Sequence, residues 1–196
     1  MNTGKYIALA GVIGAFAVAT AEAQRQSSDD TPDTTVPSHE HQSSAHKYEA
    51  IVGDNSSTAP AMFVKMAALD GMTEVELGKL AQTMANDPNV RKFGEEMMKD
   101  HSKANTELAA LAKTKGLAVP STLDSEHTAI VQKLGSKSGV DFDAAYSKQM
   151  MEDHDKAIAL FEGAAKSSDS DIAAFARKTL PTLKRHKEMA DSLPTS

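Results

Sequence analysis

Four segments in the last two thirds of the chain carry apolar residues at the alternating three- and four-residue spacing of one α-helix face. The second segment opens at Asp87-Pro88, an N-cap residue followed by a proline that suits the first helical position. We expect the third and fourth long helices to begin near Asp141 and Asp171, where capping residues precede apolar runs. The pattern predicts an all-α fold, an antiparallel four-helix bundle.

The turns within each half of this bundle are short, so the helices of each half should be antiparallel neighbours. The middle connection is longer, and residues 123–134 within it predict a short amphipathic helix that caps or crosses one end. Two helix pairs joined by one long crossover describe ferritin-like connectivity. Gly71 and Gly78 lie seven residues apart and should permit close approach of a neighbouring helix, while Pro181 predicts a kink in the fourth long helix.

Composition excludes several classes of function. There is no cysteine, which removes disulfides, thiolate metal sites and thiol catalysis. The net charge is -6 and the Lys and Arg residues form no stripe, so we expect no nucleic-acid partner. No nucleophile–base arrangement or phosphate-binding glycine loop is evident, so the sequence favours a non-enzymatic role and leaves catalysis undecided.

Residues 1–23 are typical of a secretory signal peptide, with Lys5 before an apolar run and Ala21-Glu22-Ala23 as the cleavage pattern. The apolar run is shorter than the roughly 20 residues that span a bilayer, although an uncleaved anchor is the alternative. No second apolar span follows. We therefore expect a mature protein without a membrane span, in the periplasm or secreted, with outer-membrane association as a further alternative.

Residues 24–58 are rich in Ser, Thr, Asp and Pro and lack apolar periodicity, which predicts a disordered polar linker. Its histidines, His39, His41 and His46, suit weak binding of a divalent metal, but a solvated spacer is the simpler interpretation. The predicted helical domain is then residues 59–194.

An eight-residue motif, Met-Met-x-Asp-His-x-Lys-Ala, occurs twice, in Met97–Ala104 and in Met150–Ala157. Its repetition in the second and third long helices suggests two related helix pairs about a pseudo-two-fold axis.

These motifs, together with Ala67–Ala81 (AALDGMTEVELGKLA), Phe142–Tyr146 (FDAAY) and Leu180–His186 (LPTLKRH), resemble the bacterial domain-of-unknown-function family 4142. The resemblance covers roughly Pro60 to Leu193. Members of that family are often labelled predicted outer membrane proteins and are grouped with ferritin-like folds. The resemblance therefore implies a fold, but no activity.

Three histidines and one carboxylate fall on the apolar faces of the four long helices: Glu74, His101, His154 and His186. Counted from the turns at about 1.5 Å per residue, all four can meet near the middle of the bundle. They form our candidate metal site, because buried imidazoles need partners. Around them we expect supporting residues, namely Asp70, Met97, Met98, Asp100, Met150, Met151 and Asp153.

The donor types point to copper or zinc. Thioether with imidazole suits Cu(I), and imidazole with carboxylate suits Zn or Cu(II). Ferritin-like di-iron sites need Glu-x-x-His on two helices, and no Glu precedes any of the three histidines by three residues, so di-iron is disfavoured. The simpler alternative is that the methionines only fill the core and the histidines are only hydrogen-bonded.

Each repeated histidine is preceded by an aspartate, Asp100 or Asp153, that points about 100° away around the helix. We expect these aspartates to support the site or to form ion pairs between helices, with Lys103 and Lys156 one turn away. The hydroxyl group of Tyr146, near the same face, should find a hydrogen-bond partner.

Three functions follow as hypotheses. The first is an exported helical protein that binds a transition metal or acts in envelope stress. The second is a structural or interaction module whose buried histidines make packing sensitive to pH. The third, least favoured, is a ferritin-like oxidase or peroxide-consuming enzyme. The sequence leaves open whether the partner is a second copy of the chain or another envelope protein.

Overall fold

A computed structural model of the chain describes residues 59–196, and the predicted signal peptide, the polar linker and its histidines lie outside the described residues. The described part is all-helical, as predicted, with five helices and no strand. They are α2 (Ala59–Met84), α3 (Pro88–Thr114), α4 (Ser125–Gly135), α5 (Gly139–Ala164) and α6 (Ser170–Ala190). None of them is long and apolar enough to cross a membrane.

Helix starts follow local capping chemistry. The Asp87 carboxylate accepts a hydrogen bond from the backbone of Asn89 at the start of α3, as the sequence predicts. The expected cap of α5 is wrong: α5 begins at Gly139, with Ser138 as its N-cap residue. Asp141 lies instead in the first turn, where its negative charge complements the helix dipole. Helix α6 continues through Pro181, and the kink there stays a prediction.

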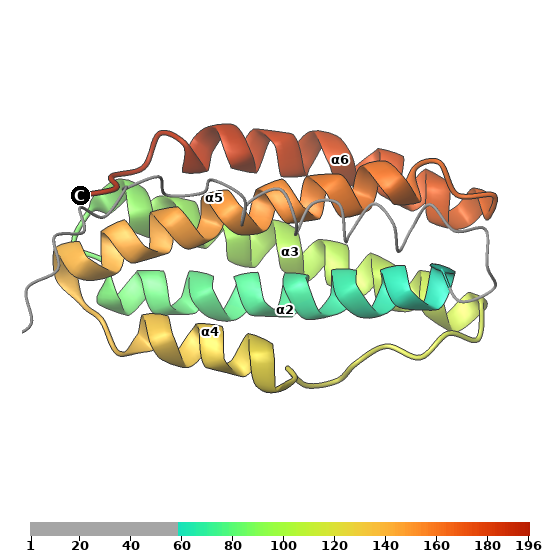
Figure 1. The fold of residues 1–196 in the computed structure, drawn as a ribbon, viewed down its shortest axis with the longest axis horizontal. Coiled ribbons are helices and arrows are strands. Elements are labelled where there is room, and N and C mark those ends of the chain that lie inside the picture. Colours follow the sequence, from blue (N-terminus) through green and yellow to red (C-terminus); the bar gives the residue numbers. More distant parts are fainter. Residues whose placement is uncertain (1–58) are drawn as a thin grey trace, which may run out of the picture. The chain divides into compact units, whose positions relative to one another are not determined.

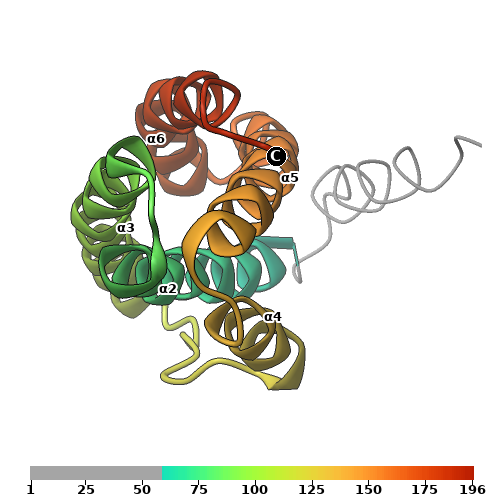
Figure 2. The ribbon, with the colours of Figure 1, turned by 90° about the vertical axis from the view of Figure 1, so that its left-hand side faces the viewer.

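The four long helices lie side by side around a common interior (Figures 1 and 2). Helix α2 pairs with α3 and α5 pairs with α6, and each pair is joined by a short turn. The connection after α3 runs back along the length of the helices before α5 begins (Figure 1). Helix α4 in this connection packs along the side of α2, which corrects our expectation that it would cap or cross one end.

Helices α2 and α3 approach each other closely at two glycines. A Cβ atom added at Gly78 would lie 2.6 Å from the backbone oxygen of Gly94, and one added at Gly94 would lie 2.6 Å from the Cβ of Ala81. Only glycine permits this separation of the two backbones. Gly78 therefore allows the close packing that we expected, and Gly94 plays the same role on the facing helix α3.

The interior contains two apolar clusters that follow each other along the helix axes. The first includes Phe63 and Phe161, whose rings meet edge to face with centroids 5.1 Å apart. The second includes Leu77 and Phe142, at the other end. Every long helix contributes to both clusters, and on each helix a buried Glu or His lies between the two contributions. This polar layer consists of Glu74, His101, His154 and His186.

Candidate metal centre

The polar layer takes one side chain from each long helix. The exposed fractions are 2% for Glu74, 6% for His101 and 0% for both His154 and His186. The helical period that buries the apolar neighbours of these residues also turns them inward. The structure thus brings together all four residues that we proposed as metal ligands.

His101 is oriented by the carboxylate of Glu74. Its Nδ1 lies 2.8 Å from Glu74 Oε2, so Nδ1 donates to the carboxylate. The other ring nitrogen, Nε2, is buried and has no hydrogen-bond partner within residues 59–196. In a neutral ring that nitrogen carries a free lone pair.

His154 is oriented by its own helix. Its Nδ1 donates to the backbone oxygen of Met150 at 2.9 Å, one turn earlier. Glu74 Oε1 lies 3.4 Å from the same nitrogen, but the single N–H is already directed at the carbonyl oxygen. Both Glu74 Oε1 and His154 Nε2 are therefore buried without a partner among the described residues.

His186 is oriented by Asp100, on the neighbouring helix α3. Its Nε2 lies 3.1 Å from Asp100 Oδ2, which also accepts from Arg185 Nη2 at 2.7 Å. Arg185 lies 3.3 Å from the same Nε2 and could only donate to it if that nitrogen were unprotonated. Because Arg185 already donates to Asp100, we assign the ring proton to Nε2. Nδ1 then carries the lone pair, and it too has no partner in the described part of the chain.

The three rings, which we call the histidine triad (His101, His154 and His186), converge. Each offers one nitrogen, and these nitrogens lie within 4.8 Å of one another. Each ring has one N–H held by an oxygen and one free nitrogen, the arrangement typical of metal-ligating histidines. An ion bound at about 2.0–2.1 Å needs the nitrogens roughly 3.3–3.6 Å apart, which a small inward movement of the rings provides.

The protonation states favour free lone pairs. Burial lowers the pKa of His154, and lowers that of His186 to about 4. Burial alone would raise the pKa of Glu74, but His101 and His154 outweigh it and the pKa falls to about 2. Burial also opposes charge on His101, yet the contact with Glu74 raises its pKa. The lowered pKa values favour the uncharged forms of His154 and His186, whereas the contact with Glu74 favours the charged form of His101, whose extra proton a metal would displace.

Residues 45–193 match the family model of DUF4142, which is described as a domain of unknown function. The chain belongs to the DUF4142 family.

The fold of this DUF4142 protein is similar to two solved DUF305 structures. A DUF305 fragment from Deinococcus radiodurans has a TM-score of 0.60 and 13% identity, covering 68% of this chain and 93% of that one. A DUF305 protein from Streptomyces coelicolor has a TM-score of 0.58 and 15% identity, covering 69% and 90%. None of the curated proteins matches the sequence. At these identities the likeness shows the fold alone.

The aspartates of the DUF4142 chain divide between different partners. Asp100 contacts His186 and forms an ion pair with Arg185 on α6, the kind of pair between helices that we considered, with Arg185 rather than Lys103 as its partner. Asp153 lies 3.6 Å from Lys156, as expected, and also accepts from the side chain of Gln149.

Asp70 lies outside the polar layer. Its Oδ1 is 3.2 Å from Nε2 of His127 on α4, a histidine that our sequence analysis missed. His127 Nδ1 in turn lies 2.6 Å from Asp124, the N-cap residue of α4. The three-residue spacing of Asp124 and His127 was a signal for the second contact, but nothing in the sequence pairs α4 with Asp70.

Two of the four methionines are buried in the apolar interior and two are half-buried. Met97 and Met150 belong to the second apolar cluster, and Met151 packs against it. Met98 lies over Gly78, since a Cβ atom added there would meet Met98 Cγ at 2.8 Å. These contacts favour imidazole nitrogen and carboxylate oxygen over thioether sulfur as the donor set.

We expected the hydroxyl group of Tyr146 to find a hydrogen-bond partner, and this expectation is wrong. The hydroxyl group is buried, with no hydrogen bond to any residue that the structure describes. The ring stacks on Phe142 at 5.4 Å and meets Phe93 edge to face at 6.2 Å. Burial, and the negative charge of Glu74, raise the pKa of Tyr146, so the phenol stays neutral.

Proposed function

We propose that this DUF4142 chain binds one divalent transition-metal ion between the histidine triad and Glu74, and that it does so as an exported, non-enzymatic protein. The supporting observations are that the three rings, one from each of three helices, offer nitrogens within 4.8 Å of one another, and that each ring has one buried nitrogen without a hydrogen-bond partner among the described residues. The opposite nitrogen of each ring is meanwhile held by Glu74, Met150 or Asp100.

A purely structural polar layer would satisfy its own polar atoms, because each buried polar atom left without a partner costs about 1–3 kcal/mol. Within residues 59–196, five buried side-chain atoms lack partners, and four of them belong to the polar layer. One bound ion would accept electron pairs from the three ring nitrogens together, while Glu74 keeps holding Nδ1 of His101. The alternative, a metal-free layer that responds to pH, leaves the convergence of these atoms without a purpose.

The donor set selects the metal. Three imidazoles and one carboxylate suit Zn²⁺ or Cu²⁺. A di-iron centre needs a carboxylate from every helix and a second ion, whereas the polar layer holds one carboxylate. We therefore keep zinc and copper as the candidate metals, and an oxidase stays the least favoured function.

Two structural predictions belong to the same proposal. The pairing of α2 with α3 and of α5 with α6, with α4 in the long connection, supports ferritin-like connectivity. The signal-peptide pattern in residues 1–23 supports delivery to the periplasm or the exterior, with the domain at residues 59–194 acting there. A role in envelope stress would then be sequestration of the ion.

Metal analysis tests the proposal. Protein starting at Gln24, purified without a His tag, is stripped with a chelator, reloaded with Zn²⁺, Cu²⁺ or Fe²⁺ in separate samples, and desalted. We expect one equivalent of zinc or copper to be retained, and none by the double variant His101→Ala/His154→Ala. The matched control is His127→Ala, which removes a half-buried histidine outside the triad. Retention that the double variant leaves intact would contradict the proposal.

A further inference from the structure

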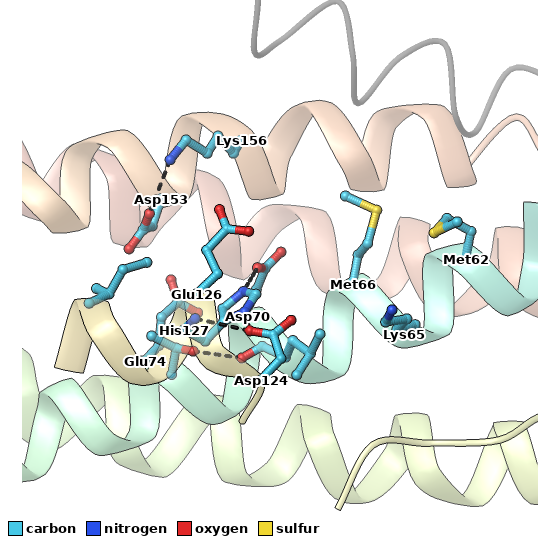
Figure 3. A pocket seen from close by; sticks show the side chains of 13 residues that line it. Met62, Lys65, Met66, Asp70, Glu74, Asp124, Glu126, His127, Asp153 and Lys156 are labelled. Carbon is cyan, nitrogen blue, oxygen red and sulfur yellow. Dashed lines mark hydrogen bonds and ion pairs between the residues drawn. The ribbon is translucent and has the colours of Figure 1, made fainter. Parts of the chain in front are cut away.

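A pocket of about 260 Å³ opens between α2, α4 and α5, beside the polar layer (Figure 3). We call it the α4 pocket. Its wall is acidic, because five carboxylates face only two lysines and one histidine. The carboxylates are Asp70, Glu74, Asp124, Glu126 and Asp153; the bases are Lys65, Lys156 and His127.

The α4 pocket and the polar layer share one side chain. Glu74 lines the pocket, and the same carboxylate contacts His101 through Oε2 at 2.8 Å. Its other oxygen, Oε1, lies 3.4 Å from His154 and has no hydrogen bond to the described residues, although the side chain is only 3% exposed. A single carboxylate therefore separates the pocket from two ligands of the triad.

Two further carboxylates of the pocket, close to Glu74 or to His154 in the sequence, are more exposed than Glu74. Asp70 lies one turn before Glu74 on α2, and its side chain is 28% exposed. Asp153 directly precedes His154 on α5, and its side chain is 17% exposed. Asp70 is held by His127, and Asp153 by Lys156 across 3.6 Å (Figure 3).

The other approaches to the polar layer do not suit a cation. A second cavity touching Glu74 and His101 measures only about 20 Å³, too small for a hydrated ion, although Asp70 and Asn105 line it beside apolar side chains such as Phe161. On the side of His186 the guanidinium group of Arg185 lies 3.3 Å from the ring and would repel a positive ion. The α4 pocket is both acidic and large enough, since six water molecules around an ion occupy roughly 180 Å³.

We propose that the α4 pocket is the entrance for the metal: Asp70 and Asp153 attract a hydrated divalent cation, and Glu74 passes it to the histidine triad. This inference rests on the proposed metal-binding function. The carboxylates and the histidines then have separate tasks. Asp70 and Asp153 govern the rate at which the ion binds, and the histidine triad governs the affinity.

Loading kinetics test the entrance. Co²⁺ is mixed with metal-free protein in a stopped-flow instrument, and its visible absorption reports coordination. The test variant is Asp70→Asn/Asp153→Asn. The control is Glu152→Gln/Asp155→Asn, which removes two charges from α5 outside the α4 pocket. At low ionic strength we expect loading to slow about tenfold in the test variant and less than twofold in the control.

Two further readouts separate an entrance from a structural effect. The final stoichiometry and the visible spectrum of the test variant should match those of the unmodified protein, because the triad is intact. The difference in rate should shrink at high salt, which screens exposed charges. If the double variant melts early, Asp153→Asn alone should still slow loading about threefold.

The outcomes distinguish the two proposals. Loading of the test variant at the unmodified rate, or equal slowing in the control, overturns the entrance alone. Failure of the unmodified protein to bind Co²⁺ overturns the metal-binding function and the entrance with it.

Discussion

Nδ1 of His101 lies 2.8 Å from Oε2 of Glu74, with both side chains almost fully buried between two apolar clusters. This contact joins α3 to α2 at the level of the polar layer. It also fixes which nitrogen of His101 is free, and so decides whether the ring can face its neighbours His154 and His186 as a ligand.

Replacing the carboxylate should weaken metal binding without emptying the site. Glu74→Gln keeps the size of the side chain but removes the charge that orients His101 and the oxygen beside His154. We expect the affinity for Zn²⁺ to fall about 10–100-fold, as for other partners of ligating histidines. A competition titration against a chelating dye measures this. The control Glu76→Gln removes an exposed carboxylate of the same helix, and equal affinities of the two variants would contradict the account.

Metal should stabilise the folded chain, because the three donor rings lie on three different helices. At a free Zn²⁺ concentration about 100 times the dissociation constant, the gain is about 2.7 kcal/mol. For a domain of this size that corresponds to a rise in melting temperature of roughly 8–13 °C. Thermal melts with and without Zn²⁺ check it. His154→Ala should lose the rise and His127→Ala should keep it; the reverse pattern would place the ion elsewhere.

The contact between α4 and α2 should weaken at high pH. The hydrogen bond that His127 donates to Asp70 raises the pKa of His127 to about 9, against burial, and Asp124 adds to the rise. A raised pKa in the folded state means that this stability is fully present below about pH 6.5 and is lost as pH rises through about 9. His127→Gln should therefore destabilise most below pH 6.5, by about 1–2 kcal/mol after allowing for solvent screening. Chemical denaturation of both proteins between pH 6 and pH 10 measures the difference, which should shrink as pH rises; a constant difference would show that the charge is unimportant.

Close packing of α2 on α3 predicts a sharp contrast between two glycines. Gly94→Ala puts a methyl group 2.6 Å from the Cβ of Ala81 and should destabilise by about 2–3 kcal/mol. Gly135→Ala meets only Leu80, at 3.6 Å, and should be neutral or stabilise by up to about 1 kcal/mol. Urea denaturation compares them. Similar effects of the two substitutions would mean that the helices are not held at this distance.

The apolar spacing of the long helices carried enough information to predict the helical fold and to bring Glu74 and the triad to one level. Periodicity alone suffices there, because a residue that interrupts an apolar face must point into the interior. The start of α5 escaped prediction because Ser138 and Asp141 are both capping residues, and the backbone at Gly139, with φ 61°, decides between them.

The sequence could not predict contacts that depend on how one helix is rotated against another. Asp100 meets Arg185 rather than Lys103 because α6 presents its guanidinium group across the α3–α6 contact. Asp70 meets His127 because the long connection lays α4 against α2. Spacing along one helix contains neither relationship, and it likewise could not show that two of the four methionines are buried in the apolar interior.

Anomalous X-ray diffraction at the zinc absorption edge, from crystals of zinc-loaded protein, tests the metal centre most directly. We predict one strong anomalous peak inside the polar layer, about 2.0–2.1 Å from Nε2 of His101, Nε2 of His154 and Nδ1 of His186. Peaks found only at the protein surface or beside His127, with none among the three rings, would contradict it.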